Sequence, residues 1–260
     1  MKRVLLLGAG KIGRMIARFL TDSGDYTVCV ADVDATALAR LGEQIPGIET
    51  QTVNAAEHAD LVRVLTGRDI VISALSFHFN QGVARAALET KASYFDLTED
   101  IATTRAVRIV AEGAAPGQIF MPQCGLAPGF VSIAASYLTE WFDEIDSVRM
   151  RVGALPLYPS NALKYNLTWS TDGLINEYCN PCEAIHDGKH VERLPLEGQE
   201  EFSLDGVRYE AFNTSGGLGT LCETLVGRVR SLDYKTIRYT GHRDLVHFLI
   251  NELRMRDRRV

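Results

Sequence analysis

A glycine motif close to the N-terminus constrains the fold of this chain more than any other feature. Gly8, Gly10 and Gly13 follow an apolar run over residues 4–7 and precede a helical pattern over residues 15–20. Where a strand runs through such a loop into a helix, the first glycine permits a tight turn and the second lets a pyrophosphate approach the backbone. The third lets helix and strand pack closely. The motif therefore predicts a dinucleotide-binding site.

The residues around this loop indicate which dinucleotide binds. A helix N-terminus offers N–H groups and a positive dipole to phosphates, so Lys11 and Ile12 are also predicted cofactor contacts. Asp32 follows a second predicted strand over residues 26–31, where a carboxylate accepts hydrogen bonds from both ribose hydroxyls and repels a 2′-phosphate. NAD is therefore favoured over NADP, although FAD-binding proteins share the fingerprint. In the alternative interpretation Asp32 caps the next helix, a role that Asp34 can also fill.

The first half of the sequence alternates short apolar runs with helical patterns. Strands are predicted over residues 70–74, 93–96 and 118–121, and helices over residues 35–41 and 81–89. The first of these strands is apolar throughout, as expected when both of its faces are covered. Alternating strands and helices imply parallel crossovers, so we expect an α/β fold with a doubly wound Rossmann sheet.

The pattern changes after Cys124, where the segment GLAPG is a turn signal. A helix is predicted over residues 130–141, and strand-like runs then dominate: SVRMRVGAL, LKYNLTWS, FSLDGVRYEAF and KTIRYTG. The dipeptide DG inside the third run indicates a hairpin. We therefore expect a Rossmann domain over residues 1–127 and a second, α+β domain with an antiparallel sheet over residues 128–260.

Composition and charge exclude several classes of partner. Asp and Glu number 33 against 27 Lys and Arg, for a net charge of −6, whereas proteins that bind nucleic-acid backbones are usually basic. No apolar run approaches the roughly 18 residues of a membrane span, and the run at residues 4–7 is too short for a signal peptide. The five cysteines are scattered, so disulfides are not expected. We expect a cytoplasmic protein that binds neither nucleic acid nor membranes.

Six segments follow one another along nearly the whole chain. Besides GAGKIG they are YFDLTED (94–100), CGLAPGF (124–130), KYNLTWSTDGLINEYCNP (164–181), FNTSGGLGTLCETL (212–225) and KTIRYTGH (235–242). Together they resemble the saccharopine dehydrogenase family, most closely its lysine epsilon-dehydrogenase and bacterial saccharopine dehydrogenase branch. The resemblance implies a nicotinamide-binding Rossmann domain, a second domain that carries the substrate, and oxidation or reduction of a carbon–nitrogen bond in an amino acid.

The C-terminus departs from the pattern of this family. Members usually continue well beyond the position of His242, with a further part of the sheet and a helix that returns to the Rossmann domain. This chain ends at Val260 after the basic stretch RMRDRRV. The resemblance therefore implies either a short member or a chain whose second domain is incomplete at its C-terminus.

Asp96 ends a predicted parallel strand, at the edge where open α/β sheets bind their ligands. Because the nicotinamide carries the hydride, the protein has to position the substrate and manage one amine proton. We expect Asp96 to orient the amine or to relay that proton. In the alternative interpretation the acidic cluster caps the helix that begins near Ile101, a role that suits Asp100 or Thr98 better.

The segment KYNLTWS supplies two more predicted catalytic residues, Lys164 and Tyr165. A lysine that is desolvated in a cleft can act as a base near neutral pH, although a lysine on a strand is more often solvated. A tyrosine can donate to a carboxylate or an imine. Trp169 and Ser170 are expected to shape the substrate pocket, and Trp169 can equally be a core residue.

Two strand ends are expected to lie near the nicotinamide. Ala74 and Leu75 end the predicted strand that precedes His78, and Cys124 ends the last strand before the domain boundary. The resemblance places Cys124 next to the nicotinamide, where a small apolar contact suits the chemistry better than a reactive thiol. His78 could contact the ring or the substrate, and a solvated loop histidine is the alternative.

The loop TSGGLGT is a second candidate anion site. Thr214, Ser215 and Gly216 precede a predicted helix, so their N–H groups and hydroxyls could bind a substrate carboxylate. An ordinary glycine-rich turn is the alternative. The guanidinium of Arg238 or Arg149 could hold a second carboxylate. Saccharopine has three carboxylates and lysine has one, so the number of such sites would discriminate between them.

Cys179 and Cys182 form a CxxC motif, with His186 four residues further on. A zinc site built on this pair needs a second pair of ligands, and no other pair has the spacing. A thioredoxin-like motif would begin a helix after an early strand, whereas this one follows the helical run LINEY. We therefore expect neither a metal nor a redox function here.

These observations lead to one hypothesis and two alternatives. The chain is predicted to be an NAD(P)-dependent dehydrogenase that oxidises saccharopine at its CH–NH group to glutamate and aminoadipate semialdehyde. In the first alternative lysine is the amine donor and ammonia is released. The second is a nucleotide-sensing protein without turnover, because the fold alone does not determine function. A homodimer is expected by analogy with the family.

Overall fold

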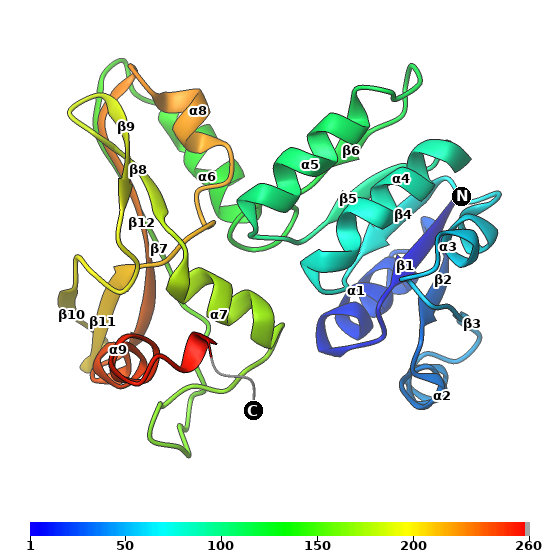
Figure 1. Cartoon of the computed structure of the whole chain (residues 1–260), viewed down its shortest axis with the longest axis horizontal. Helices are drawn as coiled ribbons and strands as arrows, with labels where there is room; N and C mark the ends of the chain where they lie inside the picture. Colours follow the sequence, from blue (N-terminus) through cyan, green and yellow to red (C-terminus); the bar gives the residue numbers. More distant parts are fainter. Residues whose placement is uncertain (258–260) are drawn as a thin grey trace. The chain divides into compact units, whose positions relative to one another are not determined.

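The computed structural model describes residues 1–257. The chain divides into two compact units, the first over Met1–Gly125 and the second beginning at Leu126 (Figure 1). Each unit has its own sheet and its own hydrophobic core. The peptide bond between Ala127 and Pro128 is cis. Of the basic C-terminal stretch RMRDRRV, the last three residues lie outside the described part of the chain.

The first unit contains a parallel sheet with the strand order β3-β2-β1-β4-β5-β6. Its strands are β1 (Lys2–Leu7), β2 (Tyr26–Asp32), β3 (Glu49–Thr52), β4 (Ile70–Ser73), β5 (Ser93–Asp96) and β6 (Phe120–Met121). Its helices are α1 (Lys11–Asp22), α2 (Ala35–Gln44), α3 (His58–Leu65), the 3₁₀ turn η1 (Phe77–Phe79), α4 (Asn80–Thr90) and α5 (Ile101–Ala111). Strand order reverses between β1 and β4, as in a doubly wound sheet. The predicted α/β Rossmann fold is confirmed.

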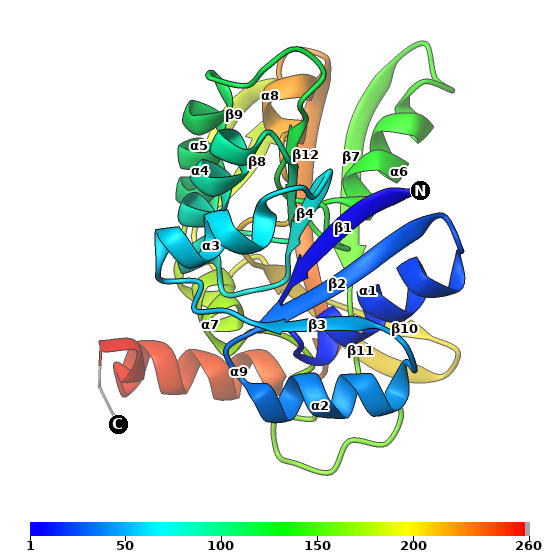
Figure 2. The same ribbon diagram turned by 90° about the vertical axis from the view of Figure 1, so that its right-hand side faces the viewer.

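The alternation of side chains along β1 explains why helices cover both faces of this sheet. Leu6 packs on one face, in a buried cluster with Ala17 of α1 and Leu41 of α2. Leu5 and Leu7 belong to a second cluster with residues of α3, α4 and α5. These three helices lie on the other side of the sheet from α1 and α2 (Figure 2). Because both faces are apolar, the strand reads as a continuous hydrophobic run. These two cores fix the loops that follow β1, β2 and β4.

The second unit contains a mixed sheet with the order β10-β11-β12-β8-β9, and β7 pairs with β12 outside this path. Its strands are β7 (Ile145–Val152), β8 (Cys182–His186), β9 (Lys189–Arg193), β10 (Glu200–Leu204), β11 (Val207–Asn213) and β12 (Val229–Tyr239). Its helices are α6 (Phe130–Thr139), α7 (Thr171–Cys179), α8 (Leu221–Leu225), α9 (His242–His247), the π-helical turn η2 (Phe248–Glu252) and the 3₁₀ turn η3 (Met255–Asp257). The expected antiparallel sheet is confirmed, with β7 as a parallel addition to β12.

The helices of the second unit pack in two groups. Residues of α6 and α8 form a buried cluster around Ile185 of β8 and Leu232 of β12. Tyr178 of α7 and Val246 of α9 form a smaller cluster around Phe212 of β11. None of the helices within residues 1–257 is long and apolar enough to cross a membrane. All five cysteines are free thiols.

The strand predicted from the run LKYNLTWS is wrong, because residues 163–170 form an irregular segment. The Asn161 side chain accepts a hydrogen bond from the backbone N–H of Tyr165 at 3.3 Å and donates one to the Tyr165 carbonyl at 2.8 Å. Lys164 adopts a left-handed φ of 51°. Side-chain bonds of this kind give the backbone a local alternative to pairing in a sheet.

Candidate dinucleotide and substrate sites

The three glycines of the first loop have different physical reasons for lacking a side chain. Gly8 has a φ of +105°, and a Cβ there would lie 2.8 Å from the Ala74 carbonyl oxygen. A Cβ on Gly13 would lie 1.9 Å from the Gly8 carbonyl oxygen, so this residue lets α1 pack against the loop. A Cβ on Gly10 would have no neighbouring atom within 4 Å. Packing therefore requires glycine at positions 8 and 13, whereas Gly10 faces open space.

The N-terminus of α1 lies directly beyond this open space. Gly10 occupies the N-cap position, and no side chain caps the helix. Lys11 and Ile12, both predicted to contact the cofactor, are the first two residues of α1. An uncapped helix N-terminus with room above its first turn suits a phosphate group, because its N–H groups and its dipole both favour a negative charge.

The Asp32 carboxylate hydrogen-bonds to the backbone of the glycine loop. Its Oδ2 accepts a hydrogen bond from the Ala9 N–H at 2.6 Å, and its Oδ1 accepts one from the Asp34 N–H at 2.9 Å. The cap of α2 is Asp34, whose Oδ1 accepts from the N–H groups of Thr36 and Ala37. The alternative interpretation of Asp32 as the cap is therefore wrong. Its carboxylate joins the end of β2 to the predicted pyrophosphate loop.

The segment after β4 contains a residue that sequence reasoning missed. Ala74 and Leu75 are half-buried, and the Ala74 N–H donates to the Leu7 carbonyl at 2.8 Å, which ties them to the end of β1. The hydroxyl oxygen of Ser76 is buried and has no hydrogen-bond partner within residues 1–257. Buried hydroxyls are usually paired, so this one suits contact with a ligand group. His78 is exposed.

Asp96 lies at the carboxyl end of β5, as expected, but it is fully buried. Its carboxylate accepts hydrogen bonds from the Tyr94 hydroxyl at 2.7 Å, the Thr98 N–H at 2.9 Å and the Gln123 N–H at 3.0 Å. Burial raises the pKa of Asp96, although these three donors favour its charged form. The contacts are those of a carboxylate that fixes the loops around it. Its catalytic role stays a prediction.

Asp100 and Cys124, which lie near Asp96, have structural contacts. Asp100 caps α5, because its Oδ1 accepts from the Thr103 N–H. The Cys124 thiol donates to the Met121 carbonyl at 3.2 Å. Burial, with a smaller effect of the Asp96 charge, raises the pKa of Cys124 to about 11. A thiol with so high a pKa is a poor nucleophile at neutral pH, which agrees with a packing role for Cys124.

In the second unit, Arg238 of β12 is buried among aromatic rings. It is only 4% exposed, and its guanidinium carbon lies 4.4 Å from the centre of the Tyr165 ring. Its Nε donates to the Tyr178 hydroxyl at 3.0 Å, and one terminal nitrogen donates to the Ile237 carbonyl at 2.9 Å. No carboxylate within residues 1–257 lies within ion-pair distance of it, although the buried Glu210 is directly opposite it on β11. A buried cation usually has an anionic partner, so this site suits a ligand carboxylate.

A hydrogen-bonded chain continues from Arg238 to His242, a second residue that sequence reasoning missed. The His242 Nε2 lies 3.0 Å from the Tyr178 hydroxyl, and Nδ1 lies 2.7 Å from the Leu163 carbonyl. Because a carbonyl can only accept, Nδ1 carries the proton and Nε2 accepts from Tyr178. Burial lowers the pKa of His242 to about 4. The hydrogen bond to the Leu163 carbonyl raises this pKa in part, and the nearby Arg238 charge contributes to lowering it. The imidazole is therefore neutral at pH 7.

The predicted residues of the KYNLTWS segment lie around this cluster in different environments. Lys164 is exposed, and its Nζ donates to the Thr240 carbonyl at 3.0 Å, so it does not lie in the enclosed cleft that the predicted role assumes. The Tyr165 hydroxyl accepts from the Trp169 indole N–H at 3.1 Å. Ser170 caps α7 by accepting from the Gly173 N–H. Tyr165 therefore belongs to the Arg238 cluster, and Ser170 has a structural bond.

The hydroxyls of the TSGGLGT loop bond within the second unit. Thr214 pairs with the Thr236 hydroxyl at 2.7 Å, and the Ser215 hydroxyl donates to the Asn176 carbonyl at 3.3 Å. Both residues are buried, and Gly216 is half-buried with a φ of 82°. These contacts agree with the alternative of a packed glycine-rich turn. The substrate role of the loop stays a prediction.

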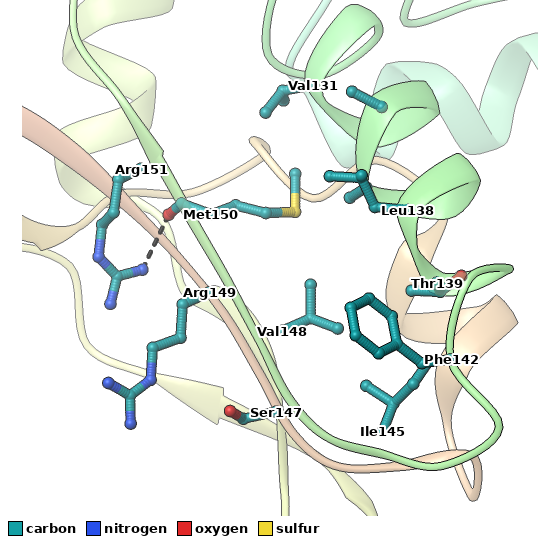
Figure 3. A pocket seen from close by; sticks show the side chains of 12 residues that line it. Val131, Leu138, Thr139, Phe142, Ile145, Ser147, Val148, Arg149, Met150 and Arg151 are labelled. Carbon is teal, nitrogen blue, oxygen red and sulfur yellow. Dashed lines mark hydrogen bonds between the residues drawn. The ribbon is translucent and has the colours of Figure 1, made fainter.

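An apolar recess lies between α6 and β7, and the view of it shows the position of Arg149, one of the two candidate arginines (Figure 3). Leu138, Phe142 and Met150 are among its lining residues, whereas the side chain of Arg149 points away from them, to the other side of β7. Arg149 is exposed. Of the two predicted carboxylate clamps, Arg238 is therefore the one with a buried environment.

The CxxC motif joins two elements. Cys179 is the last residue of α7 and Cys182 the first of β8. Burial raises the pKa of Cys182 to about 12. Neither cysteine belongs to a group of metal-ligating side chains within the described residues.

The chain matches two family models in succession. Residues 4–118 match the saccharopine dehydrogenase NADP binding domain, and residues 125–258 match the saccharopine dehydrogenase C-terminal domain. The chain belongs to the saccharopine dehydrogenase family. The family predicted from the six ordered segments is thus confirmed, and these matches support an NAD(P)-type cofactor without distinguishing NAD from NADP.

Relatives in the saccharopine dehydrogenase family are distant. Saccharopine dehydrogenase (NADP(+), L-glutamate-forming) of Saccharomyces cerevisiae is 24% identical over 274 residues, which cover 98% of this chain and 59% of the relative. The mitochondrial alpha-aminoadipic semialdehyde synthase of Mus musculus is 21% identical over 196 residues, covering 73% of this chain and 21% of that protein. This chain therefore spans only part of the length of the relatives that it matches.

A solved structure in the same family shows the same fold. Apo histidine-tagged saccharopine dehydrogenase (L-Glu forming) from Saccharomyces cerevisiae superposes with a TM-score of 0.77 at 23% identity. The match covers 96% of this chain and 58% of that one. Both the Rossmann sheet and the second α+β unit therefore have counterparts in a saccharopine dehydrogenase.

Proposed function

We propose that this chain is an NAD(P)-dependent dehydrogenase that acts on the CH–NH group of saccharopine. Hydride leaves the carbon that is bonded to nitrogen, and the resulting imine takes up water. Cleavage of the carbon–nitrogen bond then yields glutamate and aminoadipate semialdehyde, with one NAD(P)H and one proton. Membership of the family and the glutamate-forming relative support this choice of reaction.

The glycine loop holds the dinucleotide in this proposal. The open space at Gly10 and the uncapped start of α1 suit the pyrophosphate, and Asp32 suits the ribose. Ala74, Leu75 and the unpaired hydroxyl of Ser76 suit the nicotinamide end. The bound nicotinamide supplies the hydride acceptor. The protein has to orient the substrate carbon, exclude water and accept a proton.

The observation that carries the proposal is the buried guanidinium of Arg238, which has no carboxylate partner within residues 1–257. A charge removed from water without a counterion is destabilising. A substrate carboxylate would supply that counterion, and the planar guanidinium can bind it through two parallel hydrogen bonds. We therefore assign one carboxylate of the amino-acid substrate to Arg238.

The amine proton has several candidate acceptors in this proposal. Asp96, Lys164 and Tyr165 are retained from the sequence, and Tyr178 with His242 is added from the structure. Neutral His242 accepts a hydrogen bond from the Tyr178 hydroxyl, and the Tyr178 oxygen accepts one from the Arg238 guanidinium. Arg238 itself cannot give up a proton, so in this proposal the amine proton moves to the Tyr178 hydroxyl oxygen while Tyr178 passes its own proton to His242 Nε2.

We also propose that NAD is preferred to NADP and that the protein acts in the cytoplasm. Asp32 ends β2, and the next residues, Val33 and Asp34, offer no cation to a 2′-phosphate. The family model is described as NADP-binding and the yeast relative is named for NADP(+), so the support for NAD comes from Asp32 alone. Five free thiols suit a reducing compartment.

The absorbance of reduced nicotinamide, with saccharopine or lysine as the amine donor and with NAD or NADP, tests this function. We expect saccharopine to drive the reduction. Arg238→Met should raise the KM for saccharopine at least about tenfold, because a charged hydrogen-bonded pair is worth roughly 1.5–3 kcal/mol. Arg149→Met removes an exposed arginine and should leave the KM unchanged. Circular dichroism checks that both variants are folded.

Three other outcomes would change the proposal. Reduction with lysine alone would favour the lysine 6-dehydrogenase alternative, whose substrate has a single carboxylate. If neither amine supports reduction although the dinucleotide binds, a non-catalytic nucleotide sensor becomes the better interpretation. An unchanged KM for saccharopine in folded Arg238→Met would remove Arg238 from the substrate site.

A further inference from the structure

Three metal-ligating side chains meet in the second unit. They are Glu183 of β8, His190 of β9 and Cys222 of α8, and one ligand atom from each lies within 4.8 Å of the other two. None of them hydrogen-bonds to Arg238 or His242. They therefore form a cluster separate from the proposed substrate carboxylate site.

The fold accounts for this convergence. β8 and β9 form a hairpin in which His190 is directly opposite Ile185. Glu183 lies two residues before Ile185 on the same strand, so its side chain projects from the same face as His190. Cys222 packs with Ile185 in the buried cluster under α8. The hairpin register and the position of α8 thus bring the three side chains to one face of the sheet edge.

The donor atoms suit a small tetrahedral ion. Glu183 Oε1 and His190 Nε2 are 3.6 Å apart, and two ligands at about 2.0–2.1 Å from a tetrahedral zinc ion are roughly 3.4 Å apart. A thiolate, an imidazole and a carboxylate are all common zinc ligands, and the sulfur disfavours magnesium and calcium. Closing the cluster around an ion requires only small side-chain movements from distances that are already below 4.8 Å.

The three side chains differ in exposure, and the most exposed one, His190, gives a metal ion access from solvent. Cys222 is 3% exposed, whereas the side chain of Glu183 is 19% exposed and that of His190 46%. An ion can therefore arrive from solvent on the His190 side and reach the thiol from there. Three protein ligands leave the fourth position to water.

We propose that Glu183, His190 and Cys222 form a zinc-binding site. Binding replaces the proton of the Cys222 thiol with the metal and releases that proton to solvent, while Glu183 binds as a carboxylate and His190 as a neutral imidazole. Burial raises the pKa of Cys222 to about 12, to which the nearby carboxylates contribute, so the thiol is protonated before the ion arrives. The bound ion fastens the β8–β9 hairpin, whose second strand is at the sheet edge, to α8.

Metal titration of the full chain, freed of any affinity tag and treated with a chelator, tests the site. We expect isothermal titration calorimetry to give one Zn²⁺ per chain, with about one proton released when the heat is compared between buffers. The Co²⁺ form should show a thiolate-to-metal charge-transfer band. His190→Ala and Glu183→Gln should each weaken Zn²⁺ binding at least tenfold, and Cys222→Ser should abolish the charge-transfer band.

The matched control is His186→Ala, because His186 is an exposed histidine on the same hairpin, beside Asp187. We expect it to bind Zn²⁺ as the unmodified chain does. Cys222 is buried and its replacement can impair folding, whereas His190 is exposed, so His190→Ala decides the question. Equal Zn²⁺ affinity in His190→Ala and His186→Ala, or Co²⁺ binding without a thiolate band, would overturn the proposal.

Discussion

At the scale of single residues, His242 links burial to a measurable pH dependence. Its pKa falls from an ordinary value of 6.5 to about 4 in the folded chain, so the unfolded chain binds the proton more tightly. Stability from the neutral ring is therefore present above pH 6.5 and is lost as the pH falls towards 4. We expect the free energy of unfolding to drop by about 2–3 kcal/mol between pH 7 and pH 4.5 from this group.

Urea denaturation of the unmodified chain and of His242→Gln at both pH values measures this contribution. The variant should be less stable at pH 7 but should lose less stability on acidification, because its amide does not titrate. The carboxylates common to both proteins cancel in the comparison. The assignment is wrong if the two proteins lose the same free energy between pH 7 and pH 4.5.

Asp32 makes a second prediction at this scale. Asp32→Ala removes the acceptor for the Ala9 and Asp34 N–H groups as well as the proposed ribose contact. We expect NAD affinity to fall at least tenfold and the NAD/NADP preference to narrow. Asp34→Ala is the control, because it removes only the cap of α2 and should cost about 1 kcal/mol of stability. Fluorescence titration with both dinucleotides measures the ratio; an unchanged ratio in Asp32→Ala would remove Asp32 from the ribose.

The role of a residue can be predicted from the sequence when its partners are close to it in the chain. Asp34 and Asp100 cap the helices that begin immediately after them, and such local bonds can be predicted from a few neighbouring letters. The environment of Arg238 depends on Tyr165 and Tyr178, which come from distant parts of the chain. The sequence therefore offered Arg238 and Arg149 as equal candidates, and only the fold separates them.

At the scale of elements, the first unit is easier to predict than the second. The strand over Ser93–Asp96 has the predicted bounds, and its Tyr94 is buried between partly buried neighbours. The hairpin of β8 and β9 has polar residues on its exposed side and is not predicted by the apolar pattern. In the run LKYNLTWS a strand is predicted where none forms, because the Asn161 side chain hydrogen-bonds to the Tyr165 backbone instead.

At the scale of the whole molecule, exposed apolar residues of α6 favour the homodimer that the family resemblance predicts. Phe130, Ile133 and Tyr137 of α6 are all more than half exposed, at helical spacings that place them on one side of the helix. Aromatic and aliphatic groups of this kind are enriched in protein interfaces. We predict that size-exclusion chromatography with light scattering gives twice the chain mass of 28.7 kDa.

Ile133→Glu should shift this mass towards that of a monomer at micromolar concentration, because it places a charge within an apolar contact. Val33→Glu changes an equally exposed apolar residue of the first unit and should leave the mass unchanged. A monomer for the unmodified chain over the whole concentration range would contradict the dimer. Dissociation by Val33→Glu alone would place the contact on the first unit instead.

The pairing of β7 with β12 has a consequence for synthesis on the ribosome. Every strand of the first sheet has been made once Phe120–Met121 is complete, whereas β7 has to wait for its parallel partner Val229–Tyr239. At about 5–20 residues per second, this delay is roughly 5–20 s. During that interval the backbone N–H and C=O groups that β7 presents to β12 are unpaired, so we expect the nascent second unit to need protection by chaperones.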